Sequence, residues 1–379
     1  MTELAARVRR RMASDPVALD EAVRAASGGI VDDAVLAGLR RSVEAELVGA
    51  GPLEPLLALP GVTDVLVNAA DSVWVDRGQG LERAVAEFAD DDAVRRLAQR
   101  LAVAAGRRLD DAAPFVDAVL PDGTRLHAVL PPITARPTLS LRVLARERFD
   151  LPALQARGAM SAQVAGVLAA AVSARLALLI TGGTGSGKTT LLGALLGLVP
   201  PDERIVVIED AAELVIGHEH VVRLGTRVAN VEGGGAVGLP DLVRQALRMR
   251  PDRIVVGEFR GAEFADLVIA LNTGHEGGAA TMHANSAADV PARCLALGAL
   301  AGLGGDAVTS LVSAGFDLVV QLRRDRRGRT VSELGLVTDH GGRLVVRPVW
   351  SGGEGRGDGA DDLAVRLRSR GVPPPELLR

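Results

Sequence analysis

Two kinds of apolar pattern alternate along the second half of this chain. Short, continuous apolar runs such as LALLI and RIVVIED are typical of strands that are buried on both faces of a sheet. Between such runs, apolar residues recur at three- and four-residue spacing in KTTLLGALLGLV and LPDLVRQALRMR, which predicts amphipathic helices. Because strands and helices alternate, residues 148–340 are predicted to form an α/β domain around a mainly parallel sheet.

A second, smaller α/β domain is predicted at residues 49–147. SVWVD has the short, β-rich composition of a strand, and DDDAVRRLAQRLAVAAG predicts a helix with acids in its first turn. FVDAVLPDGTRLHAVL predicts a hairpin whose turn is Asp122-Gly123. Ligands of open α/β sheets bind at the carboxyl ends of the strands. The larger domain, with its mainly parallel sheet, is therefore predicted to hold the functional site.

The two ends of the chain carry weaker patterns. Residues 1–48 have helical spacing that is interrupted at Gly28-Gly29, which predicts an N-terminal helical segment. A hairpin around Asp325–Gly328 is predicted near the end of the larger domain. Residues 341–379 predict a strand and then a flexible tail, because GGEGRGDGADD is rich in glycine and aspartate.

Composition narrows the class of protein. The chain has 379 residues, a net charge of −4 and a pI of about 5.9, and only 2% of its residues are aromatic. An acidic chain with few stacking side chains is not expected to bind nucleic acid directly. Cys294 is the only cysteine, so an internal disulfide and a multi-cysteine zinc site are both excluded, and a small buried residue is predicted.

The chain is predicted to be cytoplasmic. Its N-terminus lacks the apolar core of a signal peptide, and no apolar run reaches the ~18 residues that a membrane span requires. The arginine cluster at positions 7 and 9–11 would allow peripheral association with an anionic membrane surface, with a solvated helix face as the alternative.

The clearest motif is GGTGSGKT, which matches the full phosphate-loop pattern G-x-x-x-x-G-K-[ST]. It follows an apolar strand and opens a helix, as that motif requires. Lys188 in this motif is the only lysine, since the other 42 of the 43 basic residues are arginine. A compact ammonium can reach the β- and γ-phosphates beside a glycine loop, whereas a planar guanidinium cannot take the same path. The alternative is a chance glycine-rich turn. The predicted nucleotide-binding residues are Gly182, Gly183, Thr184, Gly185, Ser186, Gly187, Lys188, Thr189 and Thr190.

Acidic residues follow two predicted strands. Glu258 ends RIVVGE and is the candidate for polarising the attacking water, while Gly257 occupies the place where a magnesium-binding aspartate is common. RIVVIED ends in Glu209 and Asp210, and Glu213 lies one turn further on; with Thr189, these three acids are the candidates for holding Mg²⁺. Glu209 is also a catalytic candidate. The alternative for all of these acids is an ordinary solvated strand end.

Two histidines lie in TGHEGGAATMHANS. His275 and His283 do not have zinc-ligand spacing, and no third ligand is near. Each could act as a neutral hydrogen-bonding group that senses the γ-phosphate, or could be structural.

Taken together, these stretches resemble the type II/type IV secretion ATPases. The match is closest to the tight-adherence (Flp) pilus assembly branch and its relatives in conjugation-like gene clusters. It covers about residues 41–340, and the matching stretches are GAGPLEPLL, DGTRLHAVLPP, TGGTGSGKTTLL, IEDAAEL, VVRLGTR, LVRQALRMRPDRIVVGEFRGAE and NTGHEGGAATMHANS. The four-cysteine insertion of the type II branch is absent, and IEDAAEL departs slightly from the expected aspartate box.

The resemblance implies a RecA-like P-loop motor domain behind a smaller N-terminal domain, with ATP and Mg²⁺ as ligands and a homo-hexameric ring. It assigns Glu209, Asp210 and Glu213 to the aspartate box, Glu258 to the Walker B segment, and His275 and His283 to the histidine box. It also implies that four arginines approach the nucleotide. They are Arg125 and Arg142 from the N-terminal domain and Arg223 and Arg227 from the arginine-rich segment, with surface ion pairs as the alternative.

The predicted function is a cytoplasmic motor ATPase. It would drive pilus assembly or type II/IV-like secretion through an inner-membrane platform protein. The alternatives are a nucleotide-gated scaffold without enzymatic activity and a DNA translocase on the same fold. The complete set of Lys188, Thr189, Glu209 and Glu258 disfavours the scaffold, and the acidic pI disfavours the translocase.

Overall fold

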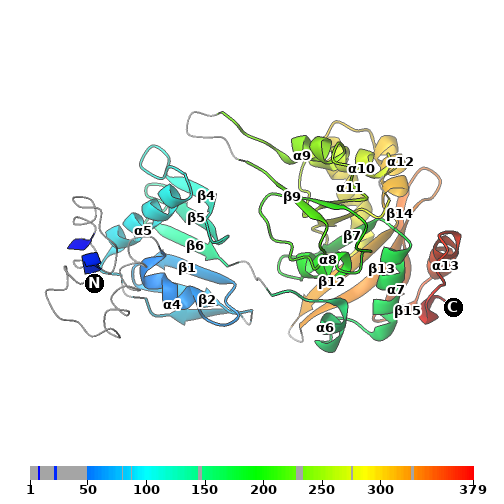
Figure 1. Ribbon diagram of the computed structural model, residues 1–379, viewed down its shortest axis with the longest axis horizontal. Helices are drawn as coiled ribbons and strands as arrows, with labels where there is room; N and C mark the ends of the chain where they lie inside the picture. The colour runs from blue at the N-terminus through cyan, green and yellow to red at the C-terminus, as the bar shows by residue number, and fades with distance from the viewer. Residues whose placement is uncertain are drawn as a thin grey trace. The chain divides into compact units, whose positions relative to one another are not determined.

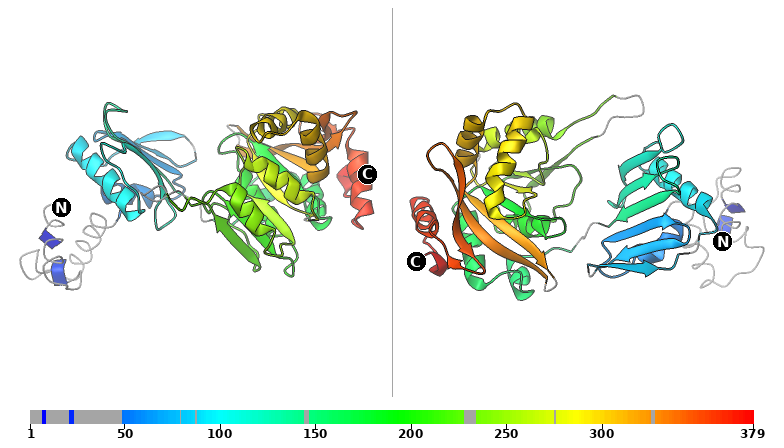
Figure 2. Two further views of the ribbon diagram at one scale, coloured as in Figure 1. Left: turned by 90° about the horizontal axis from the view of Figure 1, so that it is seen from above. Right: turned by 180° about the vertical axis from the view of Figure 1, so that it is seen from behind.

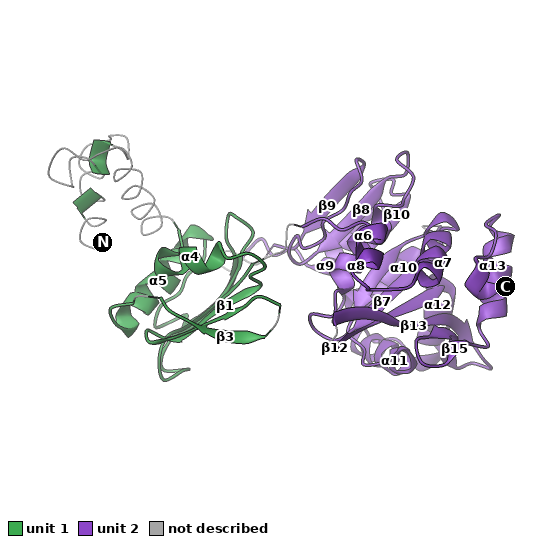
Figure 3. Cartoon of the chain, turned by 90° about the horizontal axis from the view of Figure 1, so that it is seen from below, with its two compact units in different colours: residues 1–145 green, residues 146–379 purple. Residues whose placement is uncertain are grey.

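The computed structural model divides the chain into two compact units, residues 1–145 and 146–379 (Figure 3). The residues that the structure describes are 7–8, 21–23, 49–78, 80–86, 88–143, 147–227, 234–274, 276–325 and 328–379. Within the predicted N-terminal helical segment, only residues 7–8 and 21–23 of residues 1–48 are described, and both pieces are helical. The rest of that prediction lies outside the described residues.

The first unit contains a six-stranded antiparallel sheet with the order β3-β2-β1-β6-β5-β4 (Figure 1). Helix α5 begins after Asp90, whose carboxylate accepts the N–H of Ala93. The helix buries residues at three- and four-residue spacing in the core of this unit. The elements are η1 (Gly51–Leu53), α4 (Glu54–Leu57), β1 (Asp64–Ala69), β2 (Ser72–Asp76), β3 (Leu81–Ala84), α5 (Asp91–Ala104), β4 (Phe115–Val119), β5 (Arg125–Val129) and β6 (Thr138–Arg142).

The second unit is built on a nine-stranded sheet with the order β15-β14-β13-β12-β7-β11-β10-β8-β9. The six strands from β12 to β9 are parallel, and β13, β14 and β15 extend that sheet in antiparallel fashion. The prediction of a mainly parallel sheet is confirmed. The strands are β7 (Leu178–Gly182), β8 (Ile205–Glu209), β9 (Val221–Gly225), β10 (Arg253–Val256), β11 (Ala279–Met282), β12 (Leu318–Asp325), β13 (Gly328–Asp339), β14 (Leu344–Ser351) and β15 (Gly355–Arg356).

Helices cover both faces of this sheet (Figure 2). Helices α6, α7, α8 and α13 contribute side chains to one hydrophobic core, and α9 to α12 contribute to the core on the other face. This two-faced cover explains why the central strands read as continuous apolar runs. The helices are α6 (Leu151–Ala156), α7 (Ala162–Ser173), α8 (Lys188–Leu196), α9 (Leu239–Ala246), α10 (Glu263–Leu271), η2 (Ala287–Asp289), α11 (Val290–Leu300), α12 (Gly305–Gly315), α13 (Ala360–Ser369) and η3 (Glu376–Leu378).

The apolar stretch VAGVLAAAVSARLALLI, residues 164–180, forms a helix and a strand. Helix α7 ends at Ser173, the backbone turns at Arg175 with φ +54°, and strand β7 begins at Leu178. Within the described part of the chain, no helix combines the length and the apolar character that crossing a bilayer would require.

The predicted flexible tail is wrong. Residues 341–379 form β14, β15, α13 and η3, and Leu363 and Leu367 of α13 are fully buried against the larger unit. Two glycines in this region are closely packed: a Cβ on Gly357 would lie only 2.3 Å from the carbonyl oxygen of Pro348, and one on Gly359 would lie 3.0 Å from it. The composition suggested flexibility because glycine is found both in mobile segments and where backbones pack closely. Composition alone cannot distinguish these two cases.

Candidate active site

The phosphate loop connects β7 to α8 in a tightly packed turn. Gly185 and Gly187 have φ values of +69° and +96°, in the left-handed region that favours glycine. A Cβ on Gly182 would lie 2.6 Å from Ser186 Oγ and 2.7 Å from the carbonyl oxygen of Leu322. The glycines at these three positions are therefore required by the backbone path and by its close contacts.

The loop fits a phosphate group. Gly187 caps α8 without a side-chain hydrogen bond, so no N-cap side chain occupies the first N–H groups of that helix. Ser186 Oγ is buried, and it has no hydrogen-bond partner among the described residues. Thr189, whose hydroxyl is predicted to bind Mg²⁺, is half-buried in the first turn, whereas Thr184 and Thr190 are exposed. Donors that converge on one small space are what a bound phosphate needs.

Lys188 lies at the centre of the site and is only 8% exposed. Its Nζ donates to the carbonyl oxygens of Gly182 at 3.0 Å and Gly183 at 3.1 Å, and it lies 3.3 Å from Nδ1 of His283. An ammonium group has no acceptor, so His283 Nδ1 must accept this bond and Nε2 must carry the ring proton. Burial lowers the pKa of Lys188, and the carboxylate of Glu258 opposes this shift.

His283 connects the lysine to the predicted general base. It directly follows β11, and its Nε2 lies 2.8 Å from Oε1 of Glu258. Burial is the main cause that lowers the pKa of His283, and the neighbouring charge of Lys188 adds to it. A pKa lowered in this way favours the neutral ring at neutral pH, and the role of His283 as a sensor of the γ-phosphate stays a prediction.

Glu258 lies just beyond the end of β10 with its two carboxylate oxygens in different surroundings. Arg260 donates through both Nε and Nη2 to Oε2. Oε1 is buried, and its contact with His283 lacks hydrogen-bond alignment, so it has no donor among the described residues. One carboxylate oxygen is thus held by a guanidinium, while the other is buried beside His283 Nε2.

Glu209 is buried at the end of β8 and has a structural role in this arrangement. Its Oε1 accepts the backbone N–H groups of Glu213 and Leu214, both at 2.9 Å, and Arg223 donates to Oε2 at 3.1 Å. Burial raises the pKa of Glu209, and these three donors oppose the shift. The carboxylate fixes the loop after β8, which carries the remaining acids of the aspartate box.

The glycine that replaces the usual aspartate at position 257 has a physical explanation. A Cβ on Gly257 would lie 2.9 Å from Cγ of Glu209. The neighbouring strand therefore leaves no room for a side chain at position 257 as long as Glu209 occupies its buried position. The glycine at position 257 is thus explained by the buried side chain of Glu209.

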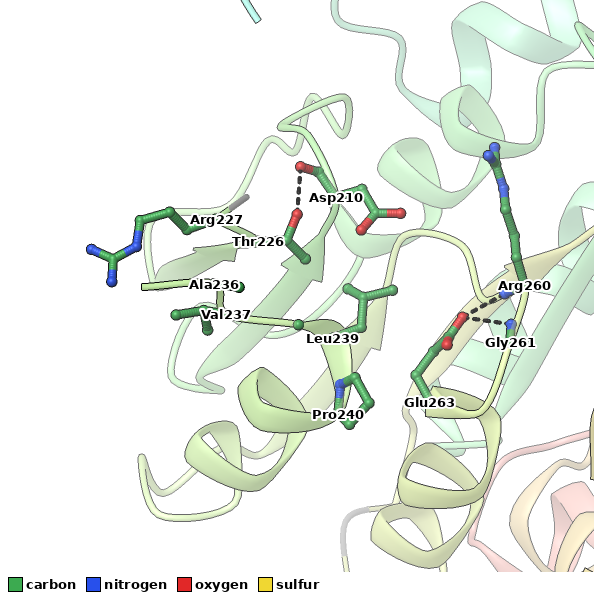
Figure 4. Close-up of a pocket in the computed structure, with 11 residues that line it drawn as sticks. Asp210, Thr226, Arg227, Ala236, Val237, Leu239, Pro240, Arg260, Gly261 and Glu263 are labelled. Atoms are coloured by element: carbon green, nitrogen blue, oxygen red, sulfur yellow. Dashed lines mark hydrogen bonds between the residues drawn. The ribbon is translucent and has the colours of Figure 1, made fainter. Parts of the chain in front are cut away.

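The other acids of the predicted metal site remain dispersed. Within the described ranges, no group of three or more His, Cys, Asp or Glu side chains is arranged to hold a metal ion. Asp210 is exposed and lines an open pocket of about 490 Å³ together with Arg260 and Glu263 (Figure 4). The hydroxyl of Thr226 donates to the backbone carbonyl of Asp210, which leaves the Asp210 carboxylate directed into the pocket region.

The predicted arginines fall into separate places. In the first unit, Arg125 and Arg142 are cross-strand neighbours on β5 and β6, and Arg142 Nε donates to Asp64 at 2.8 Å. In the second unit, Arg223 joins Glu209. Arg227 Nε donates to the carbonyl oxygen of Gly235, and its guanidinium points away from Asp210 in Figure 4. The approach of these four side chains to the nucleotide stays a prediction.

His275 lies outside the described residues, so its predicted role also stays a prediction. The structure adds two arginines that the sequence analysis did not single out. Arg260 contacts Glu258 from two positions downstream, within a stretch that carried the family resemblance. Arg329 on β13 donates through Nε to the carbonyl oxygen of Gly185 in the phosphate loop. No sequence signal pointed to Arg329, because the two residues are 144 positions apart.

A parallel sheet with a phosphate loop after β7, an acid after β10 and helices on both faces defines a RecA-like P-loop NTPase. The comparison with protein families agrees, because residues 46–334 match the model described as "Type II/IV secretion system protein". This chain belongs to that family, as the sequence resemblance predicted.

Three proteins show the range of similarity to this chain. "Putative conjugal transfer protein Rv3659c" of Mycobacterium tuberculosis is 56% identical over 347 residues, which cover 89% of this chain and 98% of that protein. "Type IV secretion system protein PtlH" of Bordetella pertussis is 36% identical over 62% of this chain and 76% of its own length. The structure of the Legionella pneumophila ATPase DotB is 19% identical with a TM-score of 0.52, covers 73% of this chain and 77% of that protein, and supports the fold alone.

Proposed function

We propose that the second unit binds and hydrolyses ATP, and that a ring of six copies converts hydrolysis into mechanical work on a membrane platform protein. The secretion or pilus system served would be of the Flp or conjugal-transfer type. The observation that carries the enzymatic part is the contact of Lys188, His283 and Glu258 at the end of the phosphate loop. Family membership and the conjugal-transfer and type IV secretion names of relatives support the secretion part.

The residues divide the work as follows. The loop amides and Lys188 would hold the β- and γ-phosphates, and the neutral His283 would contact the γ-phosphate or its water. Oε1 of Glu258 would take a proton from the attacking water, while Arg260 holds the other oxygen in place.

Thr189 would offer its hydroxyl to Mg²⁺, and Glu209, Asp210 and Glu213 are the proposed acids of that site. When bound, the ion neutralises charge on the phosphate oxygens. Arg125, Arg142, Arg223 and Arg227 are proposed to approach the phosphates in the assembled ring, where they would stabilise developing negative charge. Because the proposed partner is a membrane platform protein, the ATPase would act at the inner face of the cell membrane.

The first test of this proposal is the ATPase rate per subunit with Mg²⁺ over a wide range of protein concentration, with Lys188→Ala as the blank. A rate that rises with concentration and then levels off supports an active ring. A flat rate equal to that of the blank, despite measured ATP binding, would favour the scaffold instead.

Glu258→Gln tests the general base directly. Loss of a general base lowers turnover by about 10²–10⁴-fold. ATP affinity, measured by titration with a fluorescent nucleotide, should change little because the amide preserves the shape of the side chain. Near wild-type turnover in this variant would exclude the assigned role of Glu258.

A further inference from the structure

A buried glutamine on β12 joins two parts of the site that are far apart in sequence. Gln321 is 2% exposed, and its side-chain amide is bonded at both ends. Its Oε1 accepts the hydroxyl of Thr181 at 2.5 Å. Its Nε2 donates to the carbonyl oxygens of Asn285 at 3.1 Å and Ala284 at 3.3 Å.

The strand register shows why one side chain can reach both segments. Gln321 on β12 pairs with Thr181 on β7, and Thr181 pairs with Met282 on β11. The three residues form a row across three adjacent parallel strands. The phosphate loop begins directly after Thr181, and His283 directly follows Met282. The amide therefore ties together the two strand ends that carry Lys188's loop and the histidine.

We propose that Gln321 is a positioning residue for ATP hydrolysis, which sets the separation between the phosphate loop and His283. The proposal rests on the ATPase function proposed above. The contact that depends on this separation is the 3.3 Å approach of Lys188 Nζ to His283 Nδ1. Buried hydrogen bonds hold such a separation firmly, because a donor or acceptor that loses its partner away from water is costly.

An amide suits this position because it offers an acceptor and a donor in one planar group. Thr181 presents a hydroxyl, while Ala284 and Asn285 present carbonyl oxygens that need a donor. A carboxylate at position 321 could serve Thr181, but it would place negative charge against two carbonyl oxygens. Methionine fills a similar volume without any of these hydrogen bonds.

The test compares Gln321→Met and Gln321→Glu with a matched control, Val320→Ala. Val320 is fully buried one residue away and faces the opposite core of the sheet, so its truncation destabilises the same strand without touching the network. The expected result for both Gln321 variants is a fall in kcat of about tenfold or more, with KM for ATP changed by less than about twofold. Val320→Ala should lower the melting temperature but leave kcat nearly unchanged.

A double-mutant cycle distinguishes positioning from general weakening of the fold. If Gln321 acts through His283, then Gln321→Met should lower kcat by less than about twofold in a His283→Ala background. An equal fall in both backgrounds, or an equal fall in Val320→Ala, would overturn the proposal. If the Gln321 variants do not fold, Thr181→Val can replace them, because it removes one hydrogen bond of the network from the neighbouring strand. Its effect on kcat should vanish in the His283→Ala background.

A structure of the Gln321→Met variant tests the positioning role independently of the proposed ATPase activity. Absence of wild-type turnover above the Lys188→Ala blank would refute the proposed function by itself. The structure of the variant should show His283 Nδ1 moved beyond hydrogen-bond reach of Lys188 Nζ. An unchanged separation would refute the positioning role whatever the rate.

Discussion

Placing a side chain at position 257 is the most direct test of how the two neighbouring strand ends fit together. Gly257→Ala adds one carbon atom, and the structure places that atom 2.9 Å from Cγ of Glu209. Contacts this short force the neighbour to move. The neighbour here is a buried carboxylate that holds the backbone of Glu213 and Leu214 and pairs with Arg223.

The magnitude follows from these contacts. Inserting a carbon into a packed interior costs about 1–3 kcal/mol. Hydrogen bonds to a charged group are worth about 1.5–3 kcal/mol each, so the loss of even one of the three bonds to Glu209 costs a similar amount. We expect Gly257→Ala to lower the free energy of unfolding of the second unit by about 2.5–6 kcal/mol, the sum of these two terms.

Thermal unfolding followed by circular dichroism would measure this effect. For a unit of this size, 1 kcal/mol corresponds to a shift in Tm of about 2–4 °C. The matched control is Gly225→Ala, because Gly225 is the cross-strand partner of Glu209 and a Cβ there meets nothing within 4 Å. The control should shift Tm by no more than about 2 °C, as surface substitutions usually change stability by less than about 0.5 kcal/mol.

The decisive arm uses Glu209→Ala as the background, because truncation of Glu209 removes the atom that the new Cβ would strike. Gly257→Ala should then cost at least about 1 kcal/mol less than it does in the wild-type chain, as expected for residues in direct contact. An equal cost in both backgrounds would refute the explanation of why glycine occupies this position.

Two further predictions concern the histidine and the tail. Burial and Lys188 lower the pKa of His283 below the value of about 6.5 in an unfolded chain, so the unfolded state binds more protons at acidic pH. The free energy of unfolding should therefore fall as the pH decreases below about 6.5. Between about pH 6.5 and 5, the Tm of His283→Gln should decrease less than the Tm of the wild-type protein. Parallel Tm curves for the two proteins would contradict this prediction. Leu363→Ala should cost about 2–5 kcal/mol in urea unfolding, because Leu363 is fully buried, whereas Val365→Ala on the same helix, 59% exposed at that position, should cost under about 0.5 kcal/mol. Equal costs for the two would show that α13 is not packed on the core.

The sequence by itself determined the parts of the site that depend on local chemistry. The phosphate loop is contiguous, and its glycines, its single lysine and its hydroxyl act through the backbone of one turn. The order of apolar strands and amphipathic helices likewise determined the parallel sheet. Glu258 could be selected because the carboxyl ends of parallel strands lie on the same edge of a sheet.

Only the tertiary structure decided which distant residues meet at that edge. Gln321 lies more than 130 positions from Thr181 on β7, and Arg329 lies as far from Gly185 in the phosphate loop; no local pattern marks either residue. The reason for glycine at positions 257 and 357 also needed the fold, because it depends on the distant atoms that a Cβ would strike. Short-range spacing fixes the elements of this protein, whereas close packing between strands that are far apart in sequence fixes the geometry of its site.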